Sequence, residues 1–322
     1  MTPSAAASSA DGPSDPKATV EDLRRWARGR LRDADDGAVE AREATTLIAL
    51  ALGWTEAQVF ARGERVPSGP ERRRLTELVE RRRKGEPFAY LAGRREFFGR
   101  DFFVDSRVLI PRPETEHLIE ACLALEPAPR RILDVGTGSG CIALTLALEM
   151  PSTTVLACDI SLGALAVAQR NLEALAREDG SLRRRVHLFA SDLMAATGCP
   201  SQPIDTLVSN PPYIGDHEHL PRTVVAYEPH VALFSGPRGT ETYRRILTAA
   251  ESQPGTSRVI FELGAEQAPS VVALARDSGF QSDGSRRDLA GWERVLMLRR
   301  SESALSHHPT KPHDPVSRPL PE

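Results

Sequence analysis

The stretch that decides the fold is RILDVGTGSGCIALTLALE, residues 131–149. A short apolar run rich in branched side chains leads into a turn with three glycines, and a second apolar run follows. Glycine lets the backbone turn tightly and lets a ligand approach it closely. We therefore predict a buried strand at 131–135, a ligand-binding turn at 136–140 and a helix over 141–148.

Similar apolar runs recur further along the chain, and helical stretches separate most of them. The runs are TVLACD (154–159), VHLFASD (186–192), IDTLVSN (204–210) and RVIFEL (258–263). This alternation is typical of an α/β fold, in which a mostly parallel sheet carries helices on both faces. Residues 280–298 leave no room for a crossover helix, so we expect them to form two antiparallel strands joined near 289–291.

The rest of the chain divides by composition. Residues 18–84 carry apolar side chains at helical spacing, which predicts a small N-terminal helical bundle. Glycine, proline and aromatic residues concentrate at 85–113, where we expect a linker with a β-hairpin. The α/β domain should span 114–300, with a helix at about 114–125. Residues 1–17 and 301–322 are polar, low-complexity segments that we predict to be disordered.

Composition excludes several classes of protein. The net charge of −3 provides no general basic field for nucleic acid. The four cysteines form no CxxC pair, which argues against a disulfide framework or a zinc site and fits a reducing cytoplasm. No apolar run approaches the roughly 18 residues of a membrane span, and the N-terminus does not resemble a signal peptide. The basic run at 81–84 is either a solvated helix end or a surface that faces substrate.

The glycine-rich turn is the first candidate site. A dinucleotide fingerprint would read GxGxxG, but here the third glycine comes one residue early and Cys141 stands in its place. That spacing suits a nucleoside better than a pyrophosphate. Asp159, about twenty residues further on, could accept hydrogen bonds from ribose hydroxyls. Asp192 would lie at the edge of the base, and Ile160 would either pack on the nucleoside or belong to the core. The cofactor-binding candidates in the turn are Gly136, Thr137, Gly138, Ser139 and Gly140.

The second candidate site follows the strand 204–209. Asn210 falls at the carboxyl end of that strand, which is where open α/β sheets bind ligands. Pro211 and Pro212 have a fixed φ and no N–H, so the backbone presents carbonyl groups without competing donors. Asn210 Oδ1 and the Pro211 carbonyl could together accept both N–H groups of one planar NH₂, and Tyr213 could stack on it. A merely rigid turn would explain the prolines but not Asn210 and Tyr213.

These motifs carry a resemblance. The glycine-rich turn together with Asn-Pro-Pro-Tyr resembles S-adenosyl-L-methionine-dependent methyltransferases that modify amino groups. With LAGRREF (91–97), LIPRPETE (109–116) and Tyr-Glu-Pro (227–229), the chain resembles the peptide chain release factor glutamine methyltransferases (PrmC/HemK family) over residues 19–299. The resemblance implies a Rossmann-like seven-stranded methyltransferase sheet with an antiparallel C-terminal hairpin strand, and an N-terminal helical domain that recognises the substrate.

The resemblance also implies a reaction. The methyl donor would be S-adenosyl-L-methionine, and the acceptor would be the side-chain amide nitrogen of the glutamine in the Gly-Gly-Gln motif of class I release factors. Arg112 and Glu114 would lie near the methionine end of the cofactor or clamp the two domains together. Leu193 departs from the family, which often has an aromatic residue there to cover the adenine. We expect a cytoplasmic monomer with no metal, no membrane contact and no direct nucleic-acid substrate.

Two other functions stay open at this point. An adenine amino-methyltransferase acting on DNA or RNA would use the same acceptors, but it usually needs basic surface to follow a nucleic-acid backbone. A non-catalytic module that binds nucleosides or ribosomal partners is the other alternative. The complete Asn-Pro-Pro-Tyr motif argues against that module.

Overall fold

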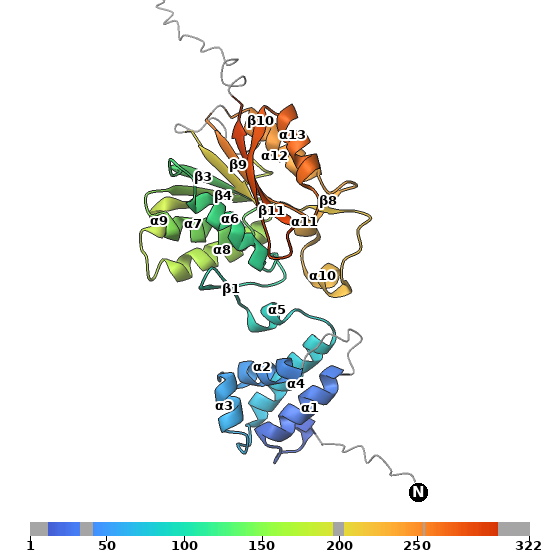
Figure 1. Ribbon diagram of the computed structural model, residues 1–322. Coiled ribbons are helices and arrows are strands. Elements are labelled where there is room, and N and C mark those ends of the chain that lie inside the picture. Colours follow the sequence, from blue (N-terminus) through green and yellow to red (C-terminus); the bar gives the residue numbers. More distant parts are fainter. Residues whose placement is uncertain (1–11, 33–40, 196–202, 254, 302–322) are drawn as a thin grey trace, which may run out of the picture. The chain divides into compact units, whose positions relative to one another are not determined.

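The computed structural model describes residues 12–32, 41–195, 203–253 and 255–301 (Figure 1). Of the two predicted disordered tails, residues 1–11 and 302–322 lie outside this described part. The chain divides into two compact units. The first contains the residues up to Arg95 with the segments 104–106 and 220–228, and the second contains most of the remainder.

The first unit is helical. Its helices are α1 (Val20–Arg32), α2 (Ala41–Leu52), α3 (Glu56–Ala61), α4 (Gly69–Arg83), α5 (Phe88–Ala92) and α10 (Arg222–Tyr227), with the 3-10 turn η1 (Gly12–Ser14) before them. Side chains at helical spacing, such as Leu23, Leu47 and Val79, meet in one apolar core. Thr55 and Ser68 begin α3 and α4 with capping boxes, which satisfy backbone N–H groups that have no partner within the helix. The predicted N-terminal helical region is therefore confirmed.

The basic run at the end of α4 is held by ion pairs. Arg82 Nε donates to Glu43 on α2 at 2.7 Å, and only 15% of the Arg82 side chain is exposed. Arg81 pairs with Glu86 at 2.6 Å and Arg83 with Glu80 at 2.9 Å. These contacts, together with the helix dipole, favour a helix-end role over one that faces substrate.

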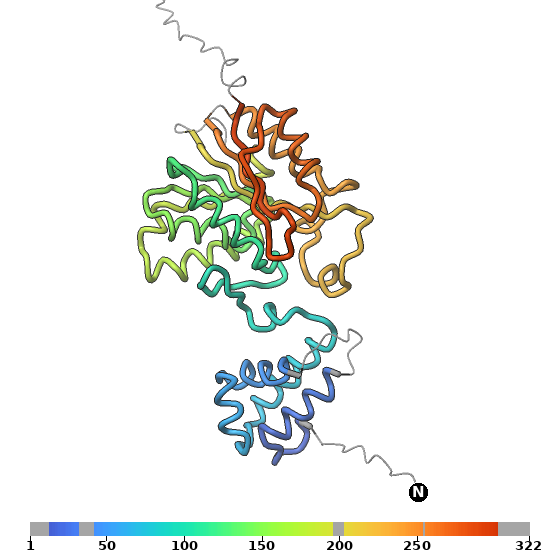
Figure 2. The backbone as a smooth tube through the Cα atoms, viewed as in Figure 1, coloured from blue at the N-terminus to red at the C-terminus, as the bar shows by residue number. Residues whose placement is uncertain are grey.

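The second unit is built on a seven-stranded sheet of order β10-β11-β9-β6-β3-β4-β5. The strands are β3 (Arg131–Val135), β4 (Thr154–Asp159), β5 (Val186–Ala190), β6 (Thr206–Ser209), β9 (Arg258–Glu262), β10 (Phe280–Arg287) and β11 (Glu293–Arg300). The first five run parallel to one another, whereas β11 pairs antiparallel with both β9 and β10. Figure 2 shows the last two strands side by side in red. The predicted fold class is confirmed.

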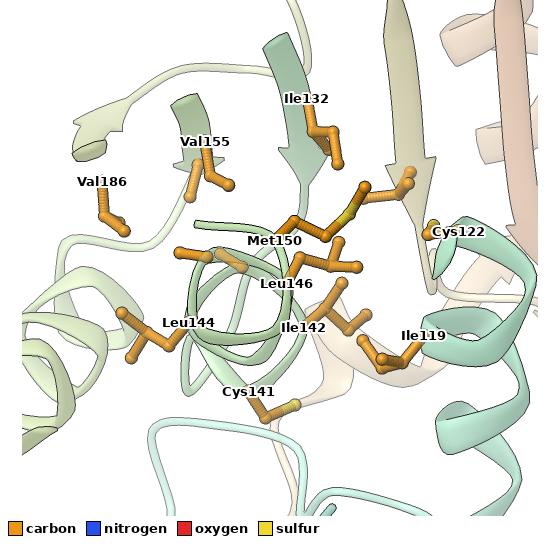
Figure 3. Packing of buried hydrophobic residues seen from close by; sticks show 14 of the residues in the cluster. Ile119, Cys122, Ile132, Cys141, Ile142, Leu144, Leu146, Met150, Val155 and Val186 are labelled. Atoms are coloured by element: carbon orange, nitrogen blue, oxygen red, sulfur yellow. The ribbon is translucent and has the colours of Figure 1, made fainter. Parts of the chain in front are cut away.

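Alternate residues of the strands pack into two different cores, because successive side chains point to opposite faces of a sheet. Ile132 belongs to the core under α6 (Glu116–Leu123), α7 (Cys141–Glu149), α8 (Leu162–Leu175) and α9 (Leu182–Arg185). Its neighbour Leu133 belongs to the core under α12 (Glu241–Glu251) and α13 (Ala268–Asp277). In Figure 3, Ile142 of α7 lies against Ile119 of α6, so the helix that follows the glycine turn is fixed from the side as well as from the sheet.

Several local boundaries differ from expectation. The strand β5 ends at Ala190, two residues before Asp192. The helix expected at 114–125 is a 3-10 turn, η2 (Pro113–Thr115), followed by α6. The hairpin of β1 (Arg95–Phe97) and β2 (Arg100–Phe102) lies within the predicted linker, and β7 (Ile214–Gly215), β8 (Phe234–Gly236) and α11 (His230–Leu233) complete the elements. No helix in the described residues is long and apolar enough to cross a membrane.

Candidate active site

The candidate site lies where the strand order reverses. Strand β3 has β4 on one side and β6 on the other, so the carboxyl ends of these strands border a crevice. A cavity of about 290 Å³ opens there. The predicted site residues that line it are Arg112, Gly136, Thr137, Gly138, Ser139, Asp159, Ile160, Asp192, Leu193, Asn210 and Pro212.

The glycines of the turn do two different things. Gly136 and Gly138 have φ of 76° and 56°, and a Cβ built on either would meet no other atom within 4 Å, so that space is left to the cavity. Gly140 has φ 82°, and its Cβ would come within 3.2 Å of Ala168 on α8. Gly140 is not among the described residues that line the cavity, and it allows close packing between helices instead.

The carboxylate of Asp159 is held against the turn by backbone groups. Its Oδ2 accepts from the Gly138 N–H at 2.9 Å, and its Oδ1 accepts from the Ser161 N–H at 2.8 Å. Burial raises the pKa of Asp159. Each carboxylate oxygen has a second lone pair, so Asp159 can still accept hydrogen bonds from the cavity. An open glycine cradle beside such an acceptor fits the nucleoside part of S-adenosyl-L-methionine.

Asp192 and Leu193, the residues predicted to lie at the base, both make contacts within the protein. Both oxygens of Asp192 accept from Arg245 Nη2, at 2.9 and 2.8 Å, so Asp192 has a protein partner at the edge assigned to the base. Arg245, which comes from α12 and also lines the cavity, stands in no motif that would have identified it. Leu193 has an unusual φ of 53°, and its carbonyl accepts from the Cys158 thiol. Ile160 is 59% exposed, which fits packing on a ligand rather than burial in the core.

Asn210 follows β6 and is tied to the protein through its amide nitrogen. Asn210 Nδ2 donates to Thr115 Oγ1 at 3.2 Å, and the Thr115 hydroxyl donates to Glu262 Oε2 at 2.6 Å. The adjacent Ser209 hydroxyl donates to the Val135 carbonyl at 2.7 Å and fixes the end of β6 against β3. Thr115 lies in the LIPRPETE motif and Glu262 in a predicted strand, but no local pattern indicated a role for either.

The residues after Asn210 hold the turn. Pro211 is buried and Tyr213 is partly buried, and neither is among the described residues that line the cavity. The Tyr213 ring packs against the core under α12 and α13, and its carbonyl accepts from Gln267 Nε2 at 2.8 Å. Burial raises the pKa of Tyr213 to about 12. In this structure Tyr213 anchors the turn, and the stacking role stays a prediction.

Of the two residues assigned with less support, Arg112 lines the cavity and Glu114 is not among its described lining residues. Both influence the buried carboxyl of Glu262. Glu114 raises the pKa of Glu262 and Arg112 lowers it.

Comparisons with known proteins agree with the motifs. The PrmC N-terminal domain family matches residues 22–93, and the methyltransferase small domain family matches residues 114–226. A release factor glutamine methyltransferase of Koribacter versatilis is 41% identical over 85% of this chain and 99% of its own length. The chain belongs to the release factor glutamine methyltransferase family.

A second relative and a solved structure are also similar to this chain. The release factor glutamine methyltransferase of Rhodopirellula baltica is 38% identical over 88% of this chain and 97% of its own length. Among solved structures, a methyltransferase from Pyrococcus furiosus covers 64% of this chain and 91% of its own length, with 19% identity and a TM-score of 0.47.

Proposed function

We propose that this member of the release factor glutamine methyltransferase family transfers a methyl group from S-adenosyl-L-methionine to a glutamine side-chain amide. The acceptor is the glutamine of the Gly-Gly-Gln motif in class I release factors. The observation that carries the proposal is the position of Asn210, which lines the same cavity as Gly136, Gly138 and Asp159. An amide acceptor and a nucleoside cradle therefore share one space.

In this proposal the glycine-rich turn at 136–140 and Asp159 hold the cofactor. The space left by Gly136 and Gly138 admits the cofactor close to the backbone, and Asp159 has lone pairs for the ribose hydroxyls. Once bound, S-adenosyl-L-methionine supplies an electrophilic methyl group on sulfur. The protein's own task is to bring a glutamine amide to that methyl group.

A glutamine amide nitrogen is a poor nucleophile because its lone pair is delocalised into the carbonyl group. Asn210 Oδ1 and the Pro211 carbonyl would each accept one N–H of that amide. These two hydrogen bonds raise the electron density on nitrogen and stabilise the positive charge that develops there. They also fix the direction of approach, so positioning supplies much of the reduction of the barrier.

The first test replaces the acceptor. Asn210→Ala should lower kcat for release-factor methylation by about 100- to 1000-fold, the cost typical of removing one preorganised hydrogen-bonding group. Mass spectrometry of the Gly-Gly-Gln peptide should show the added methylene group with the natural chain and little or none with the variant. Calorimetry should show that the variant still binds S-adenosyl-L-methionine.

Two outcomes would overturn the proposal. One is an unmodified release-factor peptide from a preparation that binds the cofactor and is folded. The other is methyl transfer to the amino group of adenine in DNA or RNA, with no transfer to release factor.

Three further assignments accompany this function. We propose that the helical domain at 18–84 recognises the release factor, that the enzyme acts as a monomer, and that it works in the cytoplasm, where its substrate takes part in translation. Kinetics with a full-length release factor and with the isolated Gly-Gly-Gln peptide would separate recognition by the helical domain from chemistry at the cavity.

A further inference from the structure

Three polar side chains from distant parts of the sequence form a continuous hydrogen-bonded series that starts at the wall of the candidate site, where Asn210 and Thr115 line the cavity. Glu262 ends β9, Thr115 precedes α6, and Asn210 follows β6. Asn210 Nδ2 donates to Thr115 Oγ1, which donates to Glu262 Oε2. Thr115 and Glu262 are each only 2% exposed, so both are shielded from bulk solvent. A buried carboxyl group is costly, so its retention here calls for an explanation.

The direction of this series follows from which groups can donate. An ionised carboxylate can only accept, so the single hydroxyl hydrogen of Thr115 must point to Glu262. The Thr115 oxygen then offers only lone pairs to Asn210, and the Asn210 NH₂ must face it. Rotating the Asn210 amide by half a turn would bring its Oδ1 against an oxygen without an available hydrogen. Glu262 therefore selects one of the two amide orientations of Asn210.

We propose that Thr115 and Glu262 are positioning residues, which hold the Asn210 amide so that its Oδ1 remains free to accept from the substrate amide. The inference rests on the proposed function, in which Asn210 Oδ1 is the acceptor. Thr115 lines the cavity and Glu262 is not among its described lining residues; in this proposal both act through Asn210 rather than on the reacting atoms.

Protonation of Glu262 would reverse the donor and acceptor roles in the hydrogen bonds that link Glu262, Thr115 and Asn210. A protonated carboxyl can donate to Thr115 Oγ1, and the Thr115 hydroxyl is then free to donate to Asn210 Oδ1. The acceptor would turn away from the substrate. The activity should therefore require the ionised form of Glu262.

The groups around Glu262 determine the pH at which it becomes protonated. The pKa of Glu262 is raised to about 7; burial is the largest cause, and the charge of Glu114 before α6 also acts upward. The hydrogen bond from Thr115 and the charges of Arg294 on β11 and Arg112 lower it. The other titratable groups that face Glu262 are Tyr213, Cys141 at the start of α7, and Tyr243 of α12, whose hydroxyl donates to the Glu262 backbone carbonyl at 2.9 Å.

The first experiment uses a matched pair at Thr115. Thr115→Val keeps the shape but removes the hydroxyl, whereas Thr115→Ser keeps the hydroxyl. We expect Thr115→Val to lower kcat about tenfold, the order of magnitude of one hydrogen bond. Thr115→Ser should keep kcat within about twofold, and KM for the release factor should be nearly unchanged in both variants. Equal kcat in the natural chain and Thr115→Val, or equal losses in both folded variants, would overturn the inference.

The second experiment follows kcat against pH in the natural chain and in Glu262→Gln. The natural chain should lose activity as the pH falls through about 7. A glutamine does not titrate, so the variant should have a lower kcat without this acidic limb. Asp134 beneath the turn also has a pKa raised to about 7 by burial, so a limb that persists in Glu262→Gln belongs to another group and would overturn the inference.

These outcomes are distinct from a failure of the proposed function. If the natural chain methylates release factor but Thr115 and Glu262 variants match it at every pH, only the positioning role fails. If the natural chain binds the cofactor and does not methylate release factor, the proposed function itself fails.

Discussion

At the scale of single residues, Glu262 combines a cost in stability with a proposed gain in function. Its side chain is buried and its pKa is raised to about 7, which means that the fold favours the neutral form. The proposed orientation of Asn210 needs the charged form. The site therefore holds Glu262 in the state that the fold disfavours, which is a cost often seen at functional residues.

The effect of Glu262 on the free energy of unfolding can be measured. Because the folded-state pKa lies above the unfolded value of 4.5, the contribution of Glu262 is fully present below pH 4.5 and is lost as pH rises through about 7. Relative to Glu262→Gln, the natural chain should lose at most about 3 kcal/mol of unfolding free energy across that window. Chemical denaturation of both proteins from pH 4 to pH 8 tests this, and a constant difference between them would contradict it.

At the scale of elements, the strand–turn–helix 131–149 shows that local sequence predicts the elements, whereas packing determines the role of each glycine. The apolar runs predict β3 and α7 closely, because their periodicity reflects the faces that they bury. The three glycines look equivalent in the sequence. Only the structure separates Gly136 and Gly138, which face the cavity, from Gly140, which faces Ala168.

A pair of substitutions tests whether Gly138 leaves space for the ligand. Gly138→Ala and Gly99→Ala each place a Cβ in open space at positive φ, at 56° and 75°, so both should lose about 1–2 kcal/mol of stability through backbone strain. Gly99 lies between β1 and β2 and does not line the cavity among the described residues. Only Gly138→Ala should weaken S-adenosyl-L-methionine binding, by about tenfold or more, because its Cβ takes up ligand space. Equal cofactor affinities in the two variants would contradict the assignment.

Elements without strong periodicity were harder to predict. The strand β5 ends before Ser191 and Asp192, although the sequence VHLFASD reads as one run. The residues around Thr115 form a 3-10 turn before α6 rather than one continuous helix, because Pro113 fixes the backbone at the start. That turn carries the hydroxyl that reaches Asn210, so the irregular element matters more to the site than the regular helix does.

At the scale of the whole molecule, the helical unit contains one apolar core and the α/β unit contains two, one on each face of its sheet. The residues described as lining the cavity all belong to the α/β unit. The glycine cradle, Asp159 and Asn210 are therefore supplied by one unit, whatever the helical unit contributes to recognising the release factor.

Hydrogen exchange can test whether the cofactor binds to the α/β unit alone. Addition of S-adenosyl-L-methionine should increase the protection of backbone amides at 136–140 and 159–161, since ligand binding stabilises the segments that it contacts. Amides in the core helices α1, α2 and α4 should keep their exchange rates. Increased protection in those helices alone would place the cofactor elsewhere.

The α/β class, the main strands and the positions of both motifs can be predicted from the sequence, because these depend on periodicity, glycine conformation and strand ends that are local in the chain. How Asn210 is held depends on the folded chain. Thr115 lies 95 residues before Asn210, and Glu262 lies 147 residues after Thr115. No local pattern links such positions, since their contact arises from the packing of α6 and the strands β6 and β9. The same holds for Arg245, which meets Asp192 only because α12 packs on the sheet.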